Sequence, residues 1–161
     1  MILVIGGRSR TGRELIRLLR EAGAPLRILT RTAQSPDDPG AVPGDLVRPD
    51  TLDAAMTGAE KVFLLCSAAH DELAWHRHAI GAAARAGVSH LVRSSILGAD
   101  PASAARFIRH HGQADQHLRG SGCRTRSCGR TSACTTCPRC GHQRSAQTAA
   151  TTRRPATPQS A

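Results

Sequence analysis

The chain lacks several residue types that catalysis and membrane insertion commonly use. It contains no tyrosine, and Lys61 is its only lysine among 161 residues, so no Tyr–Lys pair can act as a general acid. No apolar run approaches the roughly 20 residues of a membrane span. The opening Met-Ile-Leu-Val-Ile-Gly-Gly is too short for a signal peptide. These absences predict a cytoplasmic protein with no membrane partner.

Apolar and acidic side chains are also absent from the last part of the chain. Residues 123–161 contain no Leu, Ile, Val, Met, Phe, Trp or Tyr and no acidic residue, but they carry seven of the arginines. Much of the net charge of +10 therefore belongs to this segment, and a nucleic-acid partner for the body is not expected. Because the segment cannot bury a core, it is predicted to be a disordered tail after a folded domain over residues 1–122.

Residues 1–122 alternate short apolar runs with amphipathic stretches, which is typical of parallel βα units. The strand runs are almost continuously apolar, as expected where helices cover both faces of a sheet. The pattern predicts strands over 2–5, 26–30, 61–66 and 90–94, and helices over 12–22, 72–86 and about 102–119. The predicted fold is α/β, a doubly wound parallel sheet.

A glycine-rich loop, Gly6-Gly7-Arg8-Ser9-Arg10-Thr11-Gly12, joins the first predicted strand to the first helix. Gly6 permits a tight turn, Gly12 permits close packing of helix on strand, and free N–H groups at the helix start favour a diphosphate. A plain glycine turn is the alternative. The position between strand and helix favours phosphate binding.

The second predicted strand ends in Leu29-Thr30-Arg31. A site specific for NAD usually has an acidic residue here, which binds the ribose hydroxyls, whereas an arginine suits a 2′-phosphate. With Arg8 and Arg10 in the loop before it, Arg31 predicts NADP(H) in preference to NAD(H). The alternative is that Arg31 is a solvated surface charge.

The loop, together with Gly44-Asp45-Leu46 and the segments 62–67 and 92–99, resembles the NmrA-like branch of the atypical short-chain dehydrogenases/reductases. The resemblance covers nearly all of residues 1–122 and implies a Rossmann-type nucleotide-binding domain, truncated after its fifth strand. Ser9 stands where the family's G-x-x-G-x-x-G has its middle glycine. The predicted cofactor-binding residues are Gly6, Arg8, Ser9, Arg10, Thr11, Gly12, Arg31, Asp45, Leu46, Leu65, Cys66, Ser67 and Ser94.

The resembled family contains NAD(P)H-dependent reductases, including quinone reductases, and regulators that sense the dinucleotide without turnover. Where other short-chain dehydrogenases carry Tyr-x-x-x-Lys, this chain has residues 109–115. There His110 or His111 could assist proton transfer, or both could be structural, so no catalytic residue is assigned. Quinone reduction needs little beyond a positioned hydride donor. The resemblance therefore implies an NADPH-dependent reductase of small molecules such as quinones; a dinucleotide-sensing regulator and a non-functional remnant are the alternatives.

The cysteines of the tail admit two interpretations. Cys134, Cys137, Cys140 and His142 have the spacing of a small zinc knuckle, and the arginines around them are typical of nucleic-acid binding. Alternatively, one base is missing from the coding sequence near Gly122. Codons for residues 122–132 can be regrouped to encode Leu-Pro-Tyr-Thr-Val-Leu-Arg-Pro-Asn-Phe, which resembles the family's sixth strand, and each Cys codon then supplies an apolar residue. A frameshifted tail explains more of the sequence than a metal site, so no metal ligand is assigned.

Overall fold

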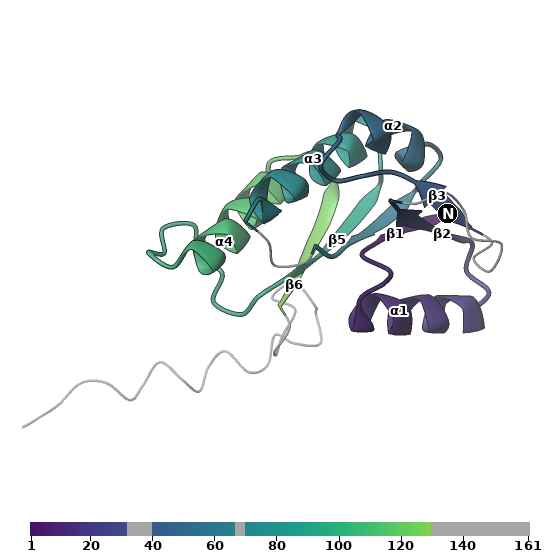
Figure 1. Cartoon of the computed structure of the whole chain (residues 1–161), viewed down its shortest axis with the longest axis horizontal. Helices are drawn as coiled ribbons and strands as arrows, with labels where there is room; N and C mark the ends of the chain where they lie inside the picture. Colours follow the sequence, from purple (N-terminus) through teal and green to yellow (C-terminus); the bar gives the residue numbers. More distant parts are fainter. Residues whose placement is uncertain (32–39, 67–69, 130–161) are drawn as a thin grey trace, which may run out of the picture.

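Six parallel strands form one sheet in the computed structural model, which describes residues 1–31, 40–66 and 70–129. The strand order is β3-β2-β1-β4-β5-β6. The elements are β1 (Ile2–Ile5), α1 (Arg10–Glu21), β2 (Leu26–Thr30), β3 (Ala41–Pro43), α2 (Asp50–Met56), β4 (Lys61–Leu64), α3 (Glu72–Arg85), β5 (His90–Ser95), α4 (Arg106–Arg119) and β6 (Arg124–Gly129). Helix α1 covers one face of the sheet, and α2, α3 and α4 cover the other (Figure 1). The predicted doubly wound α/β fold is confirmed.

The predicted elements match the observed ones closely. Strands β1 and β2 have the predicted bounds, β4 ends two residues earlier at Leu64, and β5 extends one residue further to Ser95. Strand β3 and helix α2 were not predicted from the sequence. These elements have three and seven residues, which is too short for a hydrophobic period to be recognised.

The centre of the sheet is buried on both faces. In β1, Leu3, Val4 and Ile5 are at most 1% exposed. Leu3 and Ile5 belong to the larger apolar core, whereas Val4 packs with Ile16 of α1 and Ile28 of β2. Successive side chains of a strand point to opposite faces, so β1 contributes to a core on each side and anchors the loop that follows it.

The sequence predicted a sheet that ends after the fifth strand, but the observed sheet has a sixth strand. Strand β6 pairs in parallel with β5, from His90 opposite Arg124 to Ser95 opposite Gly129. Strand pairing uses backbone N–H and C=O groups, so a segment without aliphatic side chains can still extend a sheet. The prediction of a disordered tail from residue 123 is therefore wrong for 124–129, and residues 130–161 lie outside the described part of the chain.

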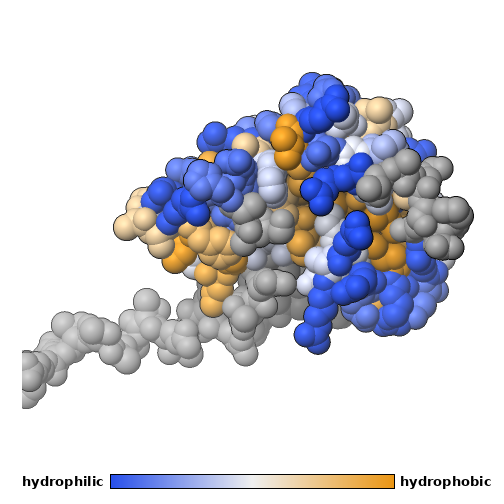
Figure 2. Space-filling model, viewed as in Figure 1, coloured by the Kyte–Doolittle hydropathy of each residue, from blue (hydrophilic) through white to orange (hydrophobic). Residues whose placement is uncertain are grey.

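The surface differs between the two ends of the molecule. Hydrophilic residues cover much of α1, whereas hydrophobic residues gather near the start of α4, where Leu97 and Phe107 are 65% and 43% exposed (Figure 2). Over the described residues, no helix has the length and apolarity needed to cross a membrane.

Candidate dinucleotide-binding site

The loop after β1 requires glycine at two positions. Gly6 has a φ of +87°, and a Cβ atom there would lie 2.3 Å from the carbonyl oxygen of Leu65. A Cβ atom on Gly12 would lie 2.3 Å from the carbonyl oxygen of Gly6. Both distances are far below a van der Waals contact. The two glycines therefore let β1, the end of β4 and the first turn of α1 approach one another closely.

Ser9 caps helix α1. Its backbone is extended, and its Oγ accepts a hydrogen bond of 2.9 Å from the N–H of Gly12, as expected of an N-cap serine. No acidic residue lies in the first turn of α1, where Arg10 and Thr11 are exposed. The partial positive charge of a helix N-terminus therefore faces no carboxylate of its own helix, which favours an anion such as a diphosphate.

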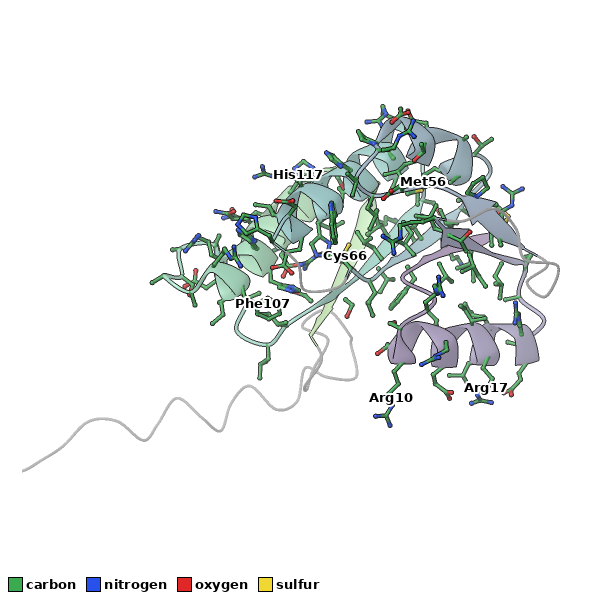
Figure 3. All side chains as sticks on the ribbon, in the orientation of Figure 1. Arg10, Arg17, Met56, Cys66, Phe107 and His117 are labelled. Atoms are coloured by element: carbon green, nitrogen blue, oxygen red, sulfur yellow. The ribbon has the colours of Figure 1, made fainter. Side chains whose placement is uncertain are left out.

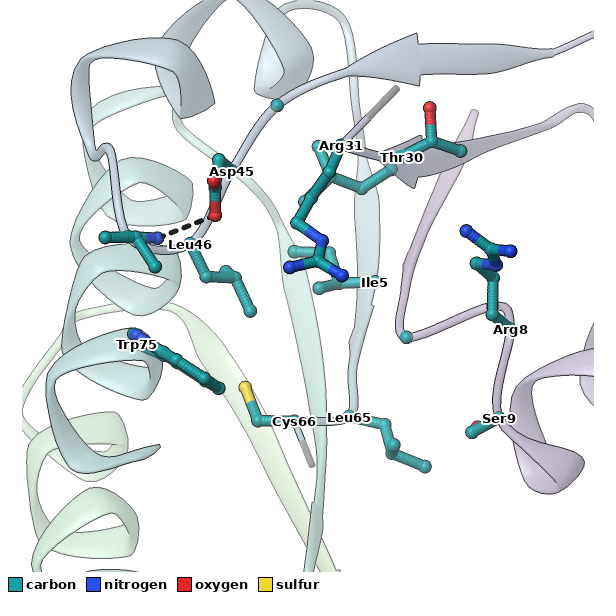
Figure 4. Close-up of a pocket in the computed structure, with 15 residues that line it drawn as sticks. Ile5, Arg8, Ser9, Thr30, Arg31, Asp45, Leu46, Leu65, Cys66 and Trp75 are labelled. Atoms are coloured by element: carbon teal, nitrogen blue, oxygen red, sulfur yellow. Dashed lines mark hydrogen bonds between the residues drawn. The ribbon is translucent and has the colours of Figure 1, made fainter. Parts of the chain in front are cut away.

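A cavity of about 440 Å³ lies at the carboxyl ends of β1, β2 and β4 (Figure 4). Its volume falls within the usual range for small-molecule sites. It also lies where the strand order changes direction, between β1 and β4, which is the usual ligand position in an open α/β sheet. Of the residues predicted from the sequence, the structure places eight on its wall: Gly6, Arg8, Ser9, Arg31, Asp45, Leu46, Leu65 and Cys66.

The other predicted residues have different positions. Arg10, Thr11 and Gly12 form the first turn of α1, directly after the lining loop. Ser94 is half-buried on β5 and does not line the cavity. Ser67 lies outside the described residues.

The cavity wall also contains residues that sequence reasoning missed. They are Ile5, Gly7, Leu29, Thr30, Gly44, Val47 and Trp75. Most flank residues that were predicted, but Trp75 comes from α3. Its position depends on how α3 packs beside the loop after β3. No local motif marks it, although it is the only tryptophan in the chain.

Two exposed arginines and one half-buried aspartate supply the charges of the cavity wall. Figure 4 shows the Arg31 guanidinium between the loop that carries Asp45 and the loop that carries Arg8. Asp45 Oδ1 accepts a hydrogen bond of 3.0 Å from the N–H of Val47, and the N–H of Asp45 donates to Thr51 Oγ1 at 2.9 Å. Asp45 therefore shapes its own loop, and the balance of charge favours an anionic ligand.

Cys66 is half-buried on the cavity wall and follows β4 by two residues (Figure 3). Burial raises the pKa of its thiol to about 12, an effect that the nearby Arg93 guanidinium only partly offsets. The thiol is therefore protonated at neutral pH, and a thiolate nucleophile at this position is not expected.

Behind the cavity, a buried arginine holds a polar network together. Arg93 on β5 is 0% exposed and pairs with Asp115 on α4. Ser95 Oγ donates to the other carboxylate oxygen of Asp115 at 2.8 Å. Arg93 also donates from Nη2 to His111 Nδ1 at 2.8 Å, and from Nε to His76 Nδ1 at 3.3 Å. Through Arg93, β5 is thus tied to α3 by His76 and to α4 by His111 and Asp115.

The two histidines of this network are electrically neutral. An arginine only donates hydrogen bonds, so His76 and His111 must accept through Nδ1. Burial, together with the nearby charge of Arg93, lowers the pKa of His76 to about 2 and that of His111 to about 4. The structure therefore shows His111 as a hydrogen-bond acceptor within the protein.

The histidines considered for proton transfer lie outside the cavity wall. His110 and His111 lie inside α4 and face Glu72 of α3, with N–O distances of 3.5 and 4.0 Å. Neither lines the cavity. Within the described ranges, no group of three His, Cys, Asp or Glu side chains is arranged to hold a metal ion.

The parallel sheet, the glycine loop at the start of α1 and the cavity at the strand ends define a Rossmann-type nucleotide-binding domain. Comparison with known proteins agrees. Residues 6–124 match the NAD(P)H-binding family, and the chain belongs to it.

Similar proteins include reductases and a regulator. The chain is 39% identical over 127 residues to an NAD(P)H azoreductase from Xenophilus azovorans, covering 76% of this chain and 44% of the relative. An NADPH-dependent quinone oxidoreductase from Escherichia coli, solved with NADPH, is 24% identical with a TM-score of 0.68, covering 79% of this chain and 47% of that one. The negative transcriptional regulator NmrA is 22% identical with a TM-score of 0.65, covering 78% and 44%.

The chain thus spans less than half the length of the relatives it matches. The predicted resemblance to NmrA-like proteins and the Rossmann-type fold are confirmed. The two solved structures bear on the fold alone, because their sequence identities are low.

Proposed function

We propose that this chain binds NADPH in the cavity at the ends of β1, β2 and β4, and that it is the cofactor-binding part of a reductase. The arrangement of the glycine loop carries the proposal. Gly6 and Gly12 bring the backbone close to the cavity, and the N-terminus of α1 offers positive charge to a diphosphate without a competing carboxylate. The thirteen residues predicted from the sequence as cofactor-binding are part of this proposal.

The preference for NADPH over NADH is assigned to Arg31, with Arg8 as its neighbour. Both guanidinium groups are exposed and line the cavity, where a 2′-phosphate would accept charge-assisted hydrogen bonds. We expect Arg31→Ala to weaken NADPH binding about 10-fold and to leave NADH binding within about 2-fold, measured by calorimetric titration. Arg20→Ala, at an exposed arginine of α1 outside the cavity wall, is the control. Equal losses for the two dinucleotides would contradict this assignment.

For the complete protein we propose hydride transfer to a small acceptor such as a quinone. The dinucleotide supplies two electrons as hydride. The acceptor gains this hydride and one proton, and becomes a hydroquinone. Among the described lining residues, the Cys66 thiol is not suited to give the proton, because its pKa is raised to about 12. Water then supplies the proton. NADPH oxidation by a small quinone or an azo dye, followed spectroscopically with the longer protein that the restored reading frame encodes, tests the activity. Turnover above the uncatalysed rate supports it.

A dinucleotide-sensing regulator is the second candidate. The observation that favours it is the state of the histidines: His76 and His111 are neutral acceptors engaged by Arg93, and the chain contains no tyrosine. Saturable NADPH binding without oxidation by any quinone or azo acceptor would support this candidate over the reductase.

We also propose that the reading frame of the coding sequence is shifted near Gly122, which would make the short form a remnant of a longer protein. The match to the family stops at residue 124. Cys123, which the restored frame would replace with leucine, already packs against the larger apolar core. Resequencing the DNA around the Gly122 codon is the test: an extra base would support the shift, and an unchanged sequence would refute it.

A further inference from the structure

Helix α4 is attached to the rest of the protein by polar side chains as much as by apolar ones. Its buried residues are His111, Gly112, Ala114, Asp115 and Leu118. Of these, only Leu118 belongs to the larger apolar core. Glycine and alanine bury little apolar area, whereas most helices dock through a wide apolar stripe. The position of α4 therefore depends on His111 and Asp115, which lie about one turn apart.

Both of these side chains meet the buried guanidinium of Arg93, which also contacts α3. Arg93 pairs with Asp115 and donates from Nη2 to Nδ1 of His111 at 2.8 Å. On α3, the two ring nitrogens of His76 lie 3.3 and 3.4 Å from Nε and Nη2 of the same guanidinium. One buried guanidinium thus joins β5, α3 and α4 on the face of the sheet opposite α1 (Figure 1).

Neither histidine can take up a proton in this arrangement without moving. A protonated imidazole carries an N–H group on both ring nitrogens and accepts no hydrogen bond. On His111, the added proton on Nδ1 would point at a donor group of Arg93. On His76, both nitrogens already face donors of Arg93, so the charged ring would meet a like charge at close range in a buried site. Each ring must leave Arg93 in order to become charged.

Two carboxylates beside the rings act in the opposite sense. Oxygens of Glu72 on α3 lie 4.0 Å from Nε2 of His111 and 3.5 Å from Nδ1 of His110 on α4. Asp115 also favours the charged form of His111. The cluster therefore attracts a proton from one side and repels it from the other.

The balance within the cluster keeps the two rings neutral. Burial and the charge of Arg93 lower the pKa of His111 to about 4 and that of His76 to about 2. The hydroxyl of Ser95 donates within the cluster, and the Cys66 thiol beside it has its pKa raised to about 12. Once the rings reach water, the pKa of a histidine returns to about 6.5. Opening of the cluster below that pH is therefore coupled to proton uptake.

We propose that His76, His111 and Arg93 form a pH-sensitive latch, which holds α4 on α3 and β5 at neutral pH and loosens as the pH falls toward 5, so that α4 detaches more readily than the rest of the chain unfolds. Single elements of a protein can open at free energies well below that of global unfolding. The cavity is expected to persist, because no residue of α4 is among its described lining residues and α1 packs on the opposite face of the sheet.

Hydrogen exchange of backbone amides, followed by NMR on the full chain from pH 7 to pH 5, measures the opening of each element. After correction for intrinsic exchange rates, each histidine that gains a proton on opening lowers the protection factor about 10-fold per pH unit below pH 6.5. We expect the most protected amides of α4 to lose between about 10-fold and 100-fold per pH unit. At pH 5 they should exchange at least about 10-fold faster than those of β1.

Variants test whether the two histidines carry this pH dependence. In His76→Asn/His111→Asn, an amide oxygen can accept from Arg93 as Nδ1 does, but the side chain does not titrate. We expect the protection of α4 in this variant to change less than about 3-fold per pH unit. His117→Asn, at an exposed histidine of the same helix, is the control and should keep the pH dependence of the wild type.

Circular dichroism checks that each variant is folded. If the double variant does not fold, His111→Asn alone takes its place, and its α4 amides should lose about 10-fold less protection per pH unit than those of the wild type, because one proton fewer is taken up.

Two results would overturn the latch. Equal protection of α4 and β1 at every pH would mean that α4 opens only when the whole chain unfolds. An unchanged pH dependence in the folded histidine variant would mean that these rings do not carry the effect. Either result leaves the proposed dinucleotide binding untouched, because none of the three latch residues is among the described lining residues of the cavity.

Discussion

The buried ion pair between Arg93 and Asp115 gives the sharpest prediction for stability. Asp115→Asn keeps the shape of the side chain but removes the charge that balances a guanidinium with no exposed surface. Breaking a buried pair by removing one partner costs about 3–5 kcal/mol, because the remaining charge stays buried. Since His76 and His111 continue to accept hydrogen bonds from Arg93, we expect the free energy of unfolding to fall by about 3 kcal/mol. This is a large share of a typical domain's stability.

Urea denaturation of the full chain, followed by circular dichroism, measures this loss. The matched control is Asp53→Asn, which breaks the Asp53–Arg85 pair; both of its side chains are more than half exposed, at 55% and 58%. An exposed pair contributes less than about 1 kcal/mol. If Asp115→Asn lowers the free energy of unfolding no more than Asp53→Asn does, the account of the buried network is wrong.

Two further predictions follow from the same structure. The folded-state pKa values of His76 and His111 are lowered to about 2 and about 4, so below pH 6.5 the unfolded chain binds more protons than the folded chain. The free energy of unfolding should therefore fall as the pH falls from about 6.5 toward 4, by about 1.4 kcal/mol per pH unit for each histidine. A free energy of unfolding that is equal at pH 7 and pH 5 in urea titrations would contradict this. Gly12→Val should abolish NADPH binding in calorimetry, because its Cβ would lie 2.3 Å from the Gly6 carbonyl oxygen and would force α1 and the loop apart. Gly81→Ala, inside α3, should bind normally. A Gly12→Val variant with wild-type affinity would refute the role of the loop.

Much of the fold was predictable because its signals are local. The β1 strand, the glycine loop and α1 follow one another along the chain, and the functions of Gly6 and Gly12 depend on the turn they share. The doubly wound arrangement follows from alternating apolar and amphipathic runs. Strand β6 was missed, because its pairing with β5 uses backbone groups and leaves no apolar pattern in the sequence.

The site was only partly predictable, because its remaining parts meet through tertiary packing. Trp75 reaches the cavity from α3, and no motif connects it with Asp45 or Leu46. Arg93 lies in β5 with no local pattern that marks it as buried, and its partner Asp115 is 22 residues away on α4. Contacts between residues so far apart in the sequence can be recognised only once the packing of the helices on the sheet is known.

Dinucleotide binding is tested most directly by a calorimetric titration of the full, folded chain with NADPH, with Gly12→Val in parallel. We expect one saturable site in the wild type and no binding in the variant. A folded wild-type protein that releases no heat and shows no binding at any accessible NADPH concentration would contradict it.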